Sequence, residues 1–162
     1  MGDALVRDKG LTPQDRLDAA AVLVLRLGVG WFIFVWAVNK VLAPQQYIDL
    51  VRWIDQVDIT RTEVFVVAAI QIAICLCVFV GFGRLFSYGA LLVIHGFTVY
   101  RQLPRYLDPF EINERGFPVN RNMTISLAAL GAMIALILLI RRDHFSLGGY
   151  IRRQVNPDAW WA

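Results

Sequence analysis

Residues 19–42, with the sequence AAAVLVLRLGVGWFIFVWAVNKVL, form an apolar run long enough to cross a membrane. A bilayer core about 30 Å thick needs about 20 helical residues. Arg26 lies seven residues into this run, which places it about 10 Å below the first interface by helical rise. A guanidinium at that depth costs about 2.5–3.5 kcal/mol on insertion scales. We therefore expect Arg26 to meet a partner, a water-filled cavity or a ligand, or to extend its side chain back to the interface.

The composition of the whole chain agrees with membrane insertion. Of its 162 residues, 57% are hydrophobic and 18% are charged, whereas soluble domains are about half apolar and a quarter charged. The apolar residues are clustered in long runs, so we expect the lipid bilayer to be the main environment. The net charge of +3 comes from arginines near the ends of these runs, which favours lipid headgroups over nucleic acid as partners.

The pattern predicts an all-α, integral membrane four-helix bundle. The predicted domains are a polar N-terminal tail (1–18), a membrane domain (19–142) with spans at about 19–42, 64–82, 85–103 and 123–140, and an interfacial C-terminal tail (143–162). Thr12 and Pro13 are typical of a helix start, so the first helix could begin before the membrane. The three to four residues between the second and third spans predict an antiparallel hairpin with a tight turn at residues 81–84.

Residues 45–63 differ from the spans because apolar and charged side chains alternate in them at helical spacing. The apolar positions are Tyr47, Leu50, Val51, Ile54 and Val57. This pattern predicts an amphipathic helix that lies on the membrane surface or over the mouth of the bundle. Basic residues are almost equally distributed between the two sides of the membrane. The pair Arg141-Arg142 directly after the last span, and Arg84 in the shortest turn, favour cytoplasmic termini.

Polar residues within the spans are the candidate ligand-binding residues: Arg26, Asn39, Lys40, Gln71 and His95. Most of them are hydrogen-bond donors in an apolar setting, which suits a ligand with carbonyl oxygens or an anionic head, such as a quinone or a lipid headgroup. The alternative is that they bond to one another between helices. We expect no metal site, no covalently bound cofactor and no catalytic residue, because no nucleotide, metal or haem motif is present.

The loop at residues 104–122 is rich in proline and charge, which predicts irregular structure ordered by turns. Its candidate docking residues are Asp108, Glu111, Glu114 and Arg115. One interpretation is that this loop docks a partner protein over the outer mouth of the bundle. The other is that it is an ordinary solvated loop.

Several of these residues resemble the DoxX family of small four-helix membrane proteins. The similarity rests on Arg26, Gly30 and Lys40 in the first helix, on GFGR at residues 81–84, and on Ser146-Leu147-Gly148 after the last helix. The chain departs from the family pattern at Ala37, where glycine is frequent, at Gln71, where an acidic residue is frequent, and at Gly148, which replaces a final aspartate. If that aspartate pairs with Arg26, the departure predicts that this chain lacks the partner.

The resemblance implies a bacterial-type cytoplasmic (inner) membrane protein connected with quinone-dependent sulfur oxidation or with redox-defence complexes. We therefore expect an accessory or quinone-interacting subunit of a membrane redox complex that is not an enzyme on its own, with other membrane or redox subunits as partners. The alternative is a structural or assembly subunit without chemistry of its own. A small-molecule transporter is less favoured, since the sequence shows no repeat and no ring of pore-lining residues.

Overall fold

The computed structural model describes residues 11–112, 116–117, 120 and 123–154, and every regular element in these ranges is helical, as the sequence predicts. The helices are α1 (Pro13–Leu42), α2 (Pro44–Asp55), α3 (Arg61–Val80), α4 (Arg84–Arg101), α5 (Leu103–Leu107), α6 (Thr124–Leu138), a 3-10 turn (Ile140–Arg142) and α7 (Leu147–Gln154). The predicted N-terminal tail up to residue 10 and the tryptophans of the C-terminal tail lie outside the described residues.

A capping box fixes the start of α1. The Thr12 hydroxyl accepts a hydrogen bond from the Asp15 backbone amide at 3.2 Å, and the Asp15 carboxylate accepts one from the Thr12 amide at 3.0 Å. Both bonds satisfy amides that the helix itself leaves unpaired. The helix therefore begins six residues before the apolar run and ends at Leu42, before Pro44.

Helices α3 and α4 form the predicted antiparallel hairpin. A second capping box, between Thr60 and Glu63, starts α3. The turn contains Gly81 at φ +66° and Gly83 at φ +54°, a left-handed conformation that glycine adopts without a steric penalty. Arg84 then begins α4 directly, so the reversal takes only three residues.

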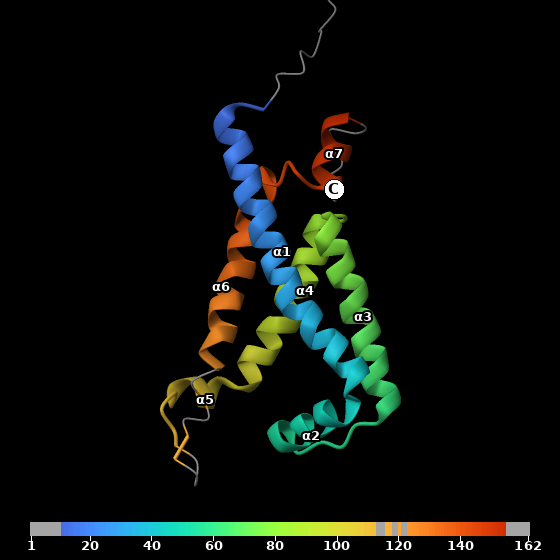
Figure 1. Ribbon diagram of the computed structural model, residues 1–162, viewed down its shortest axis with the longest axis vertical. Coiled ribbons are helices and arrows are strands. Elements are labelled where there is room, and N and C mark those ends of the chain that lie inside the picture. The colour runs from blue at the N-terminus through green and yellow to red at the C-terminus, as the bar shows by residue number, and fades with distance from the viewer. Residues whose placement is uncertain (1–10, 113–115, 118–119, 121–122, 155–162) are drawn as a thin grey trace, which may run out of the picture.

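The four longest helices pack in pairs around one core. Helix α1 contacts α3 and α6, and α4 contacts the same two helices, so that α1 crosses in front of α4 between α6 and α3 (Figure 1). The core between them consists of Val22, Val29, Ile33, Cys75, Val78, Tyr88, Leu91, Met133 and Leu136. Large apolar side chains such as Trp31, Val93 and Phe97 are 60–70% exposed on the outside, which is the arrangement that a lipid-facing surface requires.

Two helices, α1 and α3, are long and apolar enough to cross a membrane, and α6 is apolar but only 15 residues long. The described beginning of α1 and the C-terminal helix α7 lie at one end of the molecule, and α2 and α5 lie at the other (Figure 1).

The amphipathic helix α2 is shorter than its sequence pattern. It ends at Asp55, because Gln56 adopts a left-handed conformation (φ +58°) and residues 56–60 connect to α3 without helical structure. Helix α4 likewise ends at Arg101, and the first residues of the predicted loop form the short helix α5. No proline or glycine marks the end of α2, so periodicity alone does not locate it. At the end of α4 the local signal is Pro104, which follows the capping residue Gln102 by two positions.

Candidate functional site

Arg26 is paired with an acidic residue that lies far away in the sequence. Its Nη1 donates to both carboxylate oxygens of Asp143, at 3.2 and 3.1 Å, and its Nη2 donates to the Phe145 carbonyl at 2.9 Å. The side chains of Arg26 and Asp143 are only 3% and 0% exposed. The partner that the sequence analysis required for Arg26 is thus a carboxylate of this chain.

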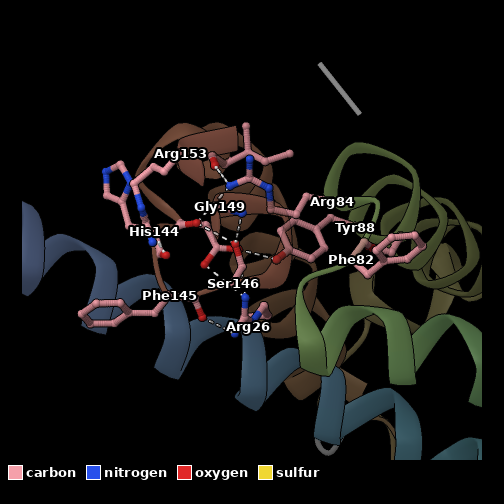
Figure 2. Close-up of polar contacts among 12 residues, drawn as sticks. Arg26, Phe82, Arg84, Tyr88, His144, Phe145, Ser146, Gly149 and Arg153 are labelled. Carbon is pink, nitrogen blue, oxygen red and sulfur yellow. Dashed lines mark hydrogen bonds and ion pairs between the residues drawn. The ribbon is translucent and has the colours of Figure 1, made fainter. Parts of the chain in front are cut away.

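The Asp143 carboxylate and the backbone around it are held from several sides. The Tyr88 hydroxyl donates to Asp143 Oδ2 at 2.5 Å. Arg84 Nη1 donates to the Asp143 and Ile140 carbonyls at 3.0 and 3.1 Å, and the Ser146 hydroxyl donates to the Asp143 carbonyl at 2.7 Å. Figure 2 shows Arg26 below this cluster, with Arg84 and Tyr88 reaching it from α4 and Ser146 lying between them.

This cluster, which we call the Arg26–Asp143 lock, fastens the segment after α6 to the helices. The Gly148 amide donates to the Gly81 carbonyl at 2.9 Å, which joins the start of α7 to the α3–α4 turn. The expectation that Arg26 lacks a carboxylate because Gly148 replaces the family's aspartate is therefore wrong. The carboxylate that pairs with Arg26 is that of Asp143, five positions before Gly148, and no motif at Asp143 predicts this pairing.

A second polar region lies toward the other end of the molecule, around a cavity of about 340 Å³. All four long helices and α2 contribute to its walls. Three of the five predicted ligand-binding residues, Lys40, Gln71 and His95, line this cavity together. Volumes of this size, with apolar walls and a few polar groups, are typical of small-molecule sites.

Lys40 is the buried cation of this cavity. Lys40 is only 6% exposed to solvent. Its Nζ donates to Gln71 Oε1 at 2.8 Å and to the Trp36 carbonyl at 3.5 Å. The Tyr47 ring lies 4.6 Å from Nζ, at a distance suited to a cation–π contact. Among the described residues no carboxylate forms an ion pair with Lys40, whereas Arg26 has one.

His95 lines the same cavity from α4. Its Nε2 lies 2.9 Å from the Ser126 carbonyl oxygen, and the Phe32 ring meets its imidazole edge to face at 5.5 Å. A carbonyl can only accept, so Nε2 carries the proton in this contact. In the neutral ring Nδ1 is then a hydrogen-bond acceptor.

Helix α2 covers the cavity with the apolar face that the sequence analysis identified. Tyr47, Leu50, Val51 and Ile54 line the cavity, whereas Val57 lies beyond the end of the helix and is half exposed. Of the two predicted locations for this helix, the mouth of the bundle is therefore the one that the contacts indicate. Arg101 Nε donates to Asp55 Oδ1 at 2.6 Å and thereby ties the end of α2 to α4.

The structure separates the remaining candidates from the cavity. Arg26 belongs to the Arg26–Asp143 lock, 14 positions before Lys40 on α1, which is about 21 Å along the helix axis. The grouping of Arg26 with His95 in one site is thus not what the structure shows. Asn39 lies beside Lys40 in the sequence but does not line the cavity.

Two of the four predicted docking residues fall within the described part of the loop. The Asn120 side-chain amide donates to the Asp108 carbonyl at 3.0 Å and to Glu111 Oε2 at 2.7 Å, so these two residues are part of an internal turn. Glu114 and Arg115 lie outside the described residues. Within the part of the chain that the structure describes, no three His, Cys, Asp or Glu residues come together as metal ligands.

The fold and these two polar regions define an all-helical membrane protein with a buried ion pair at one end and a cation-containing cavity toward the other. The DoxX family model matches residues 21–100, and the chain belongs to this family. The match includes Arg26, Lys40, Gln71 and His95 and ends before Asp143. No curated protein and no solved structure matches the chain.

Proposed function

We propose that this DoxX-family protein spans a bacterial-type cytoplasmic membrane with α1, α3, α4 and α6 and binds the head of a quinone in the Lys40 cavity. It would act there as an accessory subunit of a membrane redox complex. The observation that carries the proposal is the buried Lys40 ammonium, which has neutral partners only among the described residues. A buried cation without a counter-charge is costly, and an electron-rich carbonyl oxygen in the cavity offsets part of that cost.

The residues present fit a quinone head. Lys40 Nζ has three donors, and its bonds to Gln71 and to the Trp36 carbonyl leave one for a ligand. Gln71 uses its oxygen toward Lys40, so its amide nitrogen keeps two donors of its own. Phe32 and Trp36 supply flat apolar walls for a ring. A bound quinone would supply two-electron redox chemistry with proton uptake at its oxygens.

His95 takes a different role from the one that its position in the sequence predicts. Its place in an apolar span groups it with the donors that would bind carbonyl oxygens. Because Nε2 is engaged with Ser126, the neutral ring would offer Nδ1 as an acceptor. That atom suits the hydroxyl of the reduced form of the ligand, whereas Lys40 suits the carbonyl of the oxidised form.

The accessory role follows from what the cavity residues can do. They bind and orient a quinone, but none of them can supply or accept electrons, so a redox partner must do so. The loop with Asp108, Glu111, Glu114 and Arg115 is the proposed docking segment for such a partner. Exposed arginines at the other end, including Arg141, Arg152 and Arg153, support the proposal that this end faces the cytoplasm.

Photolabelling tests the cavity directly. The purified protein in lipid nanodiscs would be illuminated with an azido-benzoquinone, and the labelled peptides would be identified by mass spectrometry. We expect label on the α1 and α2 segments that line the cavity, and competition by an ordinary short-chain benzoquinone. Lys40→Met should reduce the labelling about tenfold, because a hydrogen bond from a charged donor contributes about 1.5–3 kcal/mol. Asn39→Leu is the matched control and should label normally.

The same variants distinguish the assembly alternative, which one observation favours. The Lys40–Gln71 bond joins α1 to α3, so these residues could serve only to hold the helices together. In that case Lys40→Met would lower the melting temperature and the yield of co-purifying subunits, and no saturable label would appear in the wild type. Label that does not compete with free quinone would overturn the quinone proposal.

A further inference from the structure

A second hollow lies on the outside of the molecule, away from the Lys40 cavity. It is a groove of about 480 Å³ between α3 and α4, next to the turn that joins them. It is lined by Ala73 and Cys77 of α3, by Gly83 of the turn and by Ala90 of α4. The large side chains of Phe82 and Phe86 flank it and are 44% and 61% exposed. The groove is therefore a nearly wholly apolar channel with walls of aromatic rings.

The groove follows the α3–α4 hairpin from the turn toward the middle of α4. Its lining begins at Gly83 in the turn and reaches Ala90 two helical turns further. Seven residues of helical rise correspond to about 10 Å. An apolar hollow of this kind takes a hydrocarbon chain and offers nothing to a soluble anion.

Helix α7 places a cation above the same turn. Its second residue, Gly148, donates from its amide to the Gly81 carbonyl at 2.9 Å. Arg152 lies four residues later, on the same face of α7, and is exposed. Among the described residues Arg152 has no hydrogen-bond or ion-pair partner. Its neighbour Arg153 instead donates to the His144 carbonyl at 2.9 Å, as Figure 2 shows.

The charge that the described residues contribute at this end of the molecule is positive. Arg16 and Arg141 are also exposed there, and Arg142 is paired with Asp18. The remaining described carboxylate at the start of α1, Asp15, is engaged in its capping box. Uncompensated arginines at a membrane surface attract anionic lipids by about 1 kcal/mol each, and a guanidinium binds a phosphate through two parallel hydrogen bonds.

From these two observations together we infer that the α3–α4 groove and Arg152 form a binding site for one anionic phospholipid. The acyl chain occupies the groove between Ala73 and Ala90, and the headgroup phosphate is bound by Arg152. The site is independent of the quinone proposal, because it shares no residue with the Lys40 cavity. It gives α7 a fixed position on the membrane surface, since the lipid joins this helix to the α3–α4 hairpin.

Native mass spectrometry tests the inference on the full chain. The protein would be reconstituted in nanodiscs of phosphatidylcholine with one-fifth phosphatidylglycerol, released, and examined for retained lipid. We expect one phosphatidylglycerol to remain bound. Arg152→Gln should lower its retention about fivefold, and Ala73→Phe, which fills the groove from its exposed edge, should abolish it.

Two control variants make the same kinds of substitution, Arg to Gln and Ala to Phe, at positions outside the proposed lipid site. Arg61→Gln removes an exposed arginine at the opposite end of α3, and Ala128→Phe enlarges an exposed position of α6. Both should retain the lipid, and in detergent without added lipid all four variants should keep the wild-type melting temperature. Equal retention of phosphatidylcholine, equal loss in the controls, or displacement of the lipid by inorganic phosphate would each overturn the inference.

Discussion

Arg26 and Asp143 carry opposite charges and are both buried away from water. Each charge is therefore compensated mainly by the other. Removal of one partner leaves an uncompensated buried charge, which costs about 3–5 kcal/mol in buried pairs. Asp143→Asn should therefore lower the melting temperature in detergent strongly. Asp58→Asn is the matched control, since the Asp58 side chain is 81% exposed in its pair with Arg52 and such pairs contribute at most about 1 kcal/mol.

The double variant Arg26→Met/Asp143→Leu separates charge from packing in the same lock. If the loss in Asp143→Asn comes from the stranded guanidinium, removal of both charges should recover most of the stability. A double variant as unstable as Asp143→Asn would show that shape, and not charge compensation, dominates here. A melting temperature of Asp143→Asn equal to that of Asp58→Asn would contradict the lock altogether.

Gly81 and Gly83 offer a second comparison at the scale of one residue. Both have positive φ, so alanine at either position is strained by about 1 kcal/mol. A Cβ at Gly83 would meet open space, whereas a Cβ at Gly81 would collide with the Arg26 guanidinium and the Ser146 side chain. Gly81→Ala should therefore cost about 1–3 kcal/mol more than Gly83→Ala in thermal unfolding. Equal losses of stability in the two variants would show that Arg26 and Ser146 move aside for the added Cβ without a measurable free-energy cost.

The sequence predicts that Arg26 needs compensation, but it does not identify the partner. Asp143 lies 117 positions away and outside every predicted span. Its pairing depends on how the chain turns back after α6, and no local pattern encodes that. Lys40 and Gln71, in contrast, could be recognised as polar residues in apolar helices, although their mutual contact could not.

At the scale of elements, the sequence predicts a helix boundary correctly where a local signal marks that boundary. The Thr12 cap and the turn at residues 81–84 are such signals. Helix α2 extends only to Asp55, whereas its apolar pattern continues to Val57. Gln56, which adopts the left-handed conformation there, is not a residue type that predicts a helix end. The last residue of the helix, Asp55, pairs with Arg101 of α4, a tertiary contact that no local pattern encodes.

The Asp55–Arg101 pair therefore predicts how firmly α2 is held. The two side chains are about one quarter exposed, so we expect a contribution near 1 kcal/mol. Asp55→Asn should raise amide hydrogen exchange in Pro44–Asp55 about fivefold, because local opening becomes easier by that amount. Asp49→Asn is the control, since the exposed Asp49 accepts a hydrogen bond from Gln45 of the same helix and ties α2 to no other helix among the described residues. Unchanged exchange in Asp55→Asn would show that apolar contacts alone hold α2.

For the whole molecule, composition and run length predict the all-helical class, but not which polar residues meet. Helical rise places Arg26 and His95 at similar depth, and only the rotation of each helix decides which neighbour a side chain faces. The structure turns Arg26 toward Asp143 and His95 toward Ser126 and the cavity. Along α1 the core residues Val29 and Ile33 lie between Arg26 and Lys40, and each polar region has its own partners.

This separation predicts that the two polar regions respond independently. Residues more than about 10 Å apart without shared partners usually have additive effects, and Arg26 and Lys40 are about 21 Å apart along α1. Asp143→Asn should lower thermal stability without changing quinone photolabelling at temperatures where the protein is folded. Lys40→Met should change photolabelling with a smaller effect on stability. In the double variant, both changes should equal the sum of the single effects, within about 0.5 kcal/mol. A larger coupling would mean that α1 transmits strain from the lock to the cavity, and the two regions would then be one site.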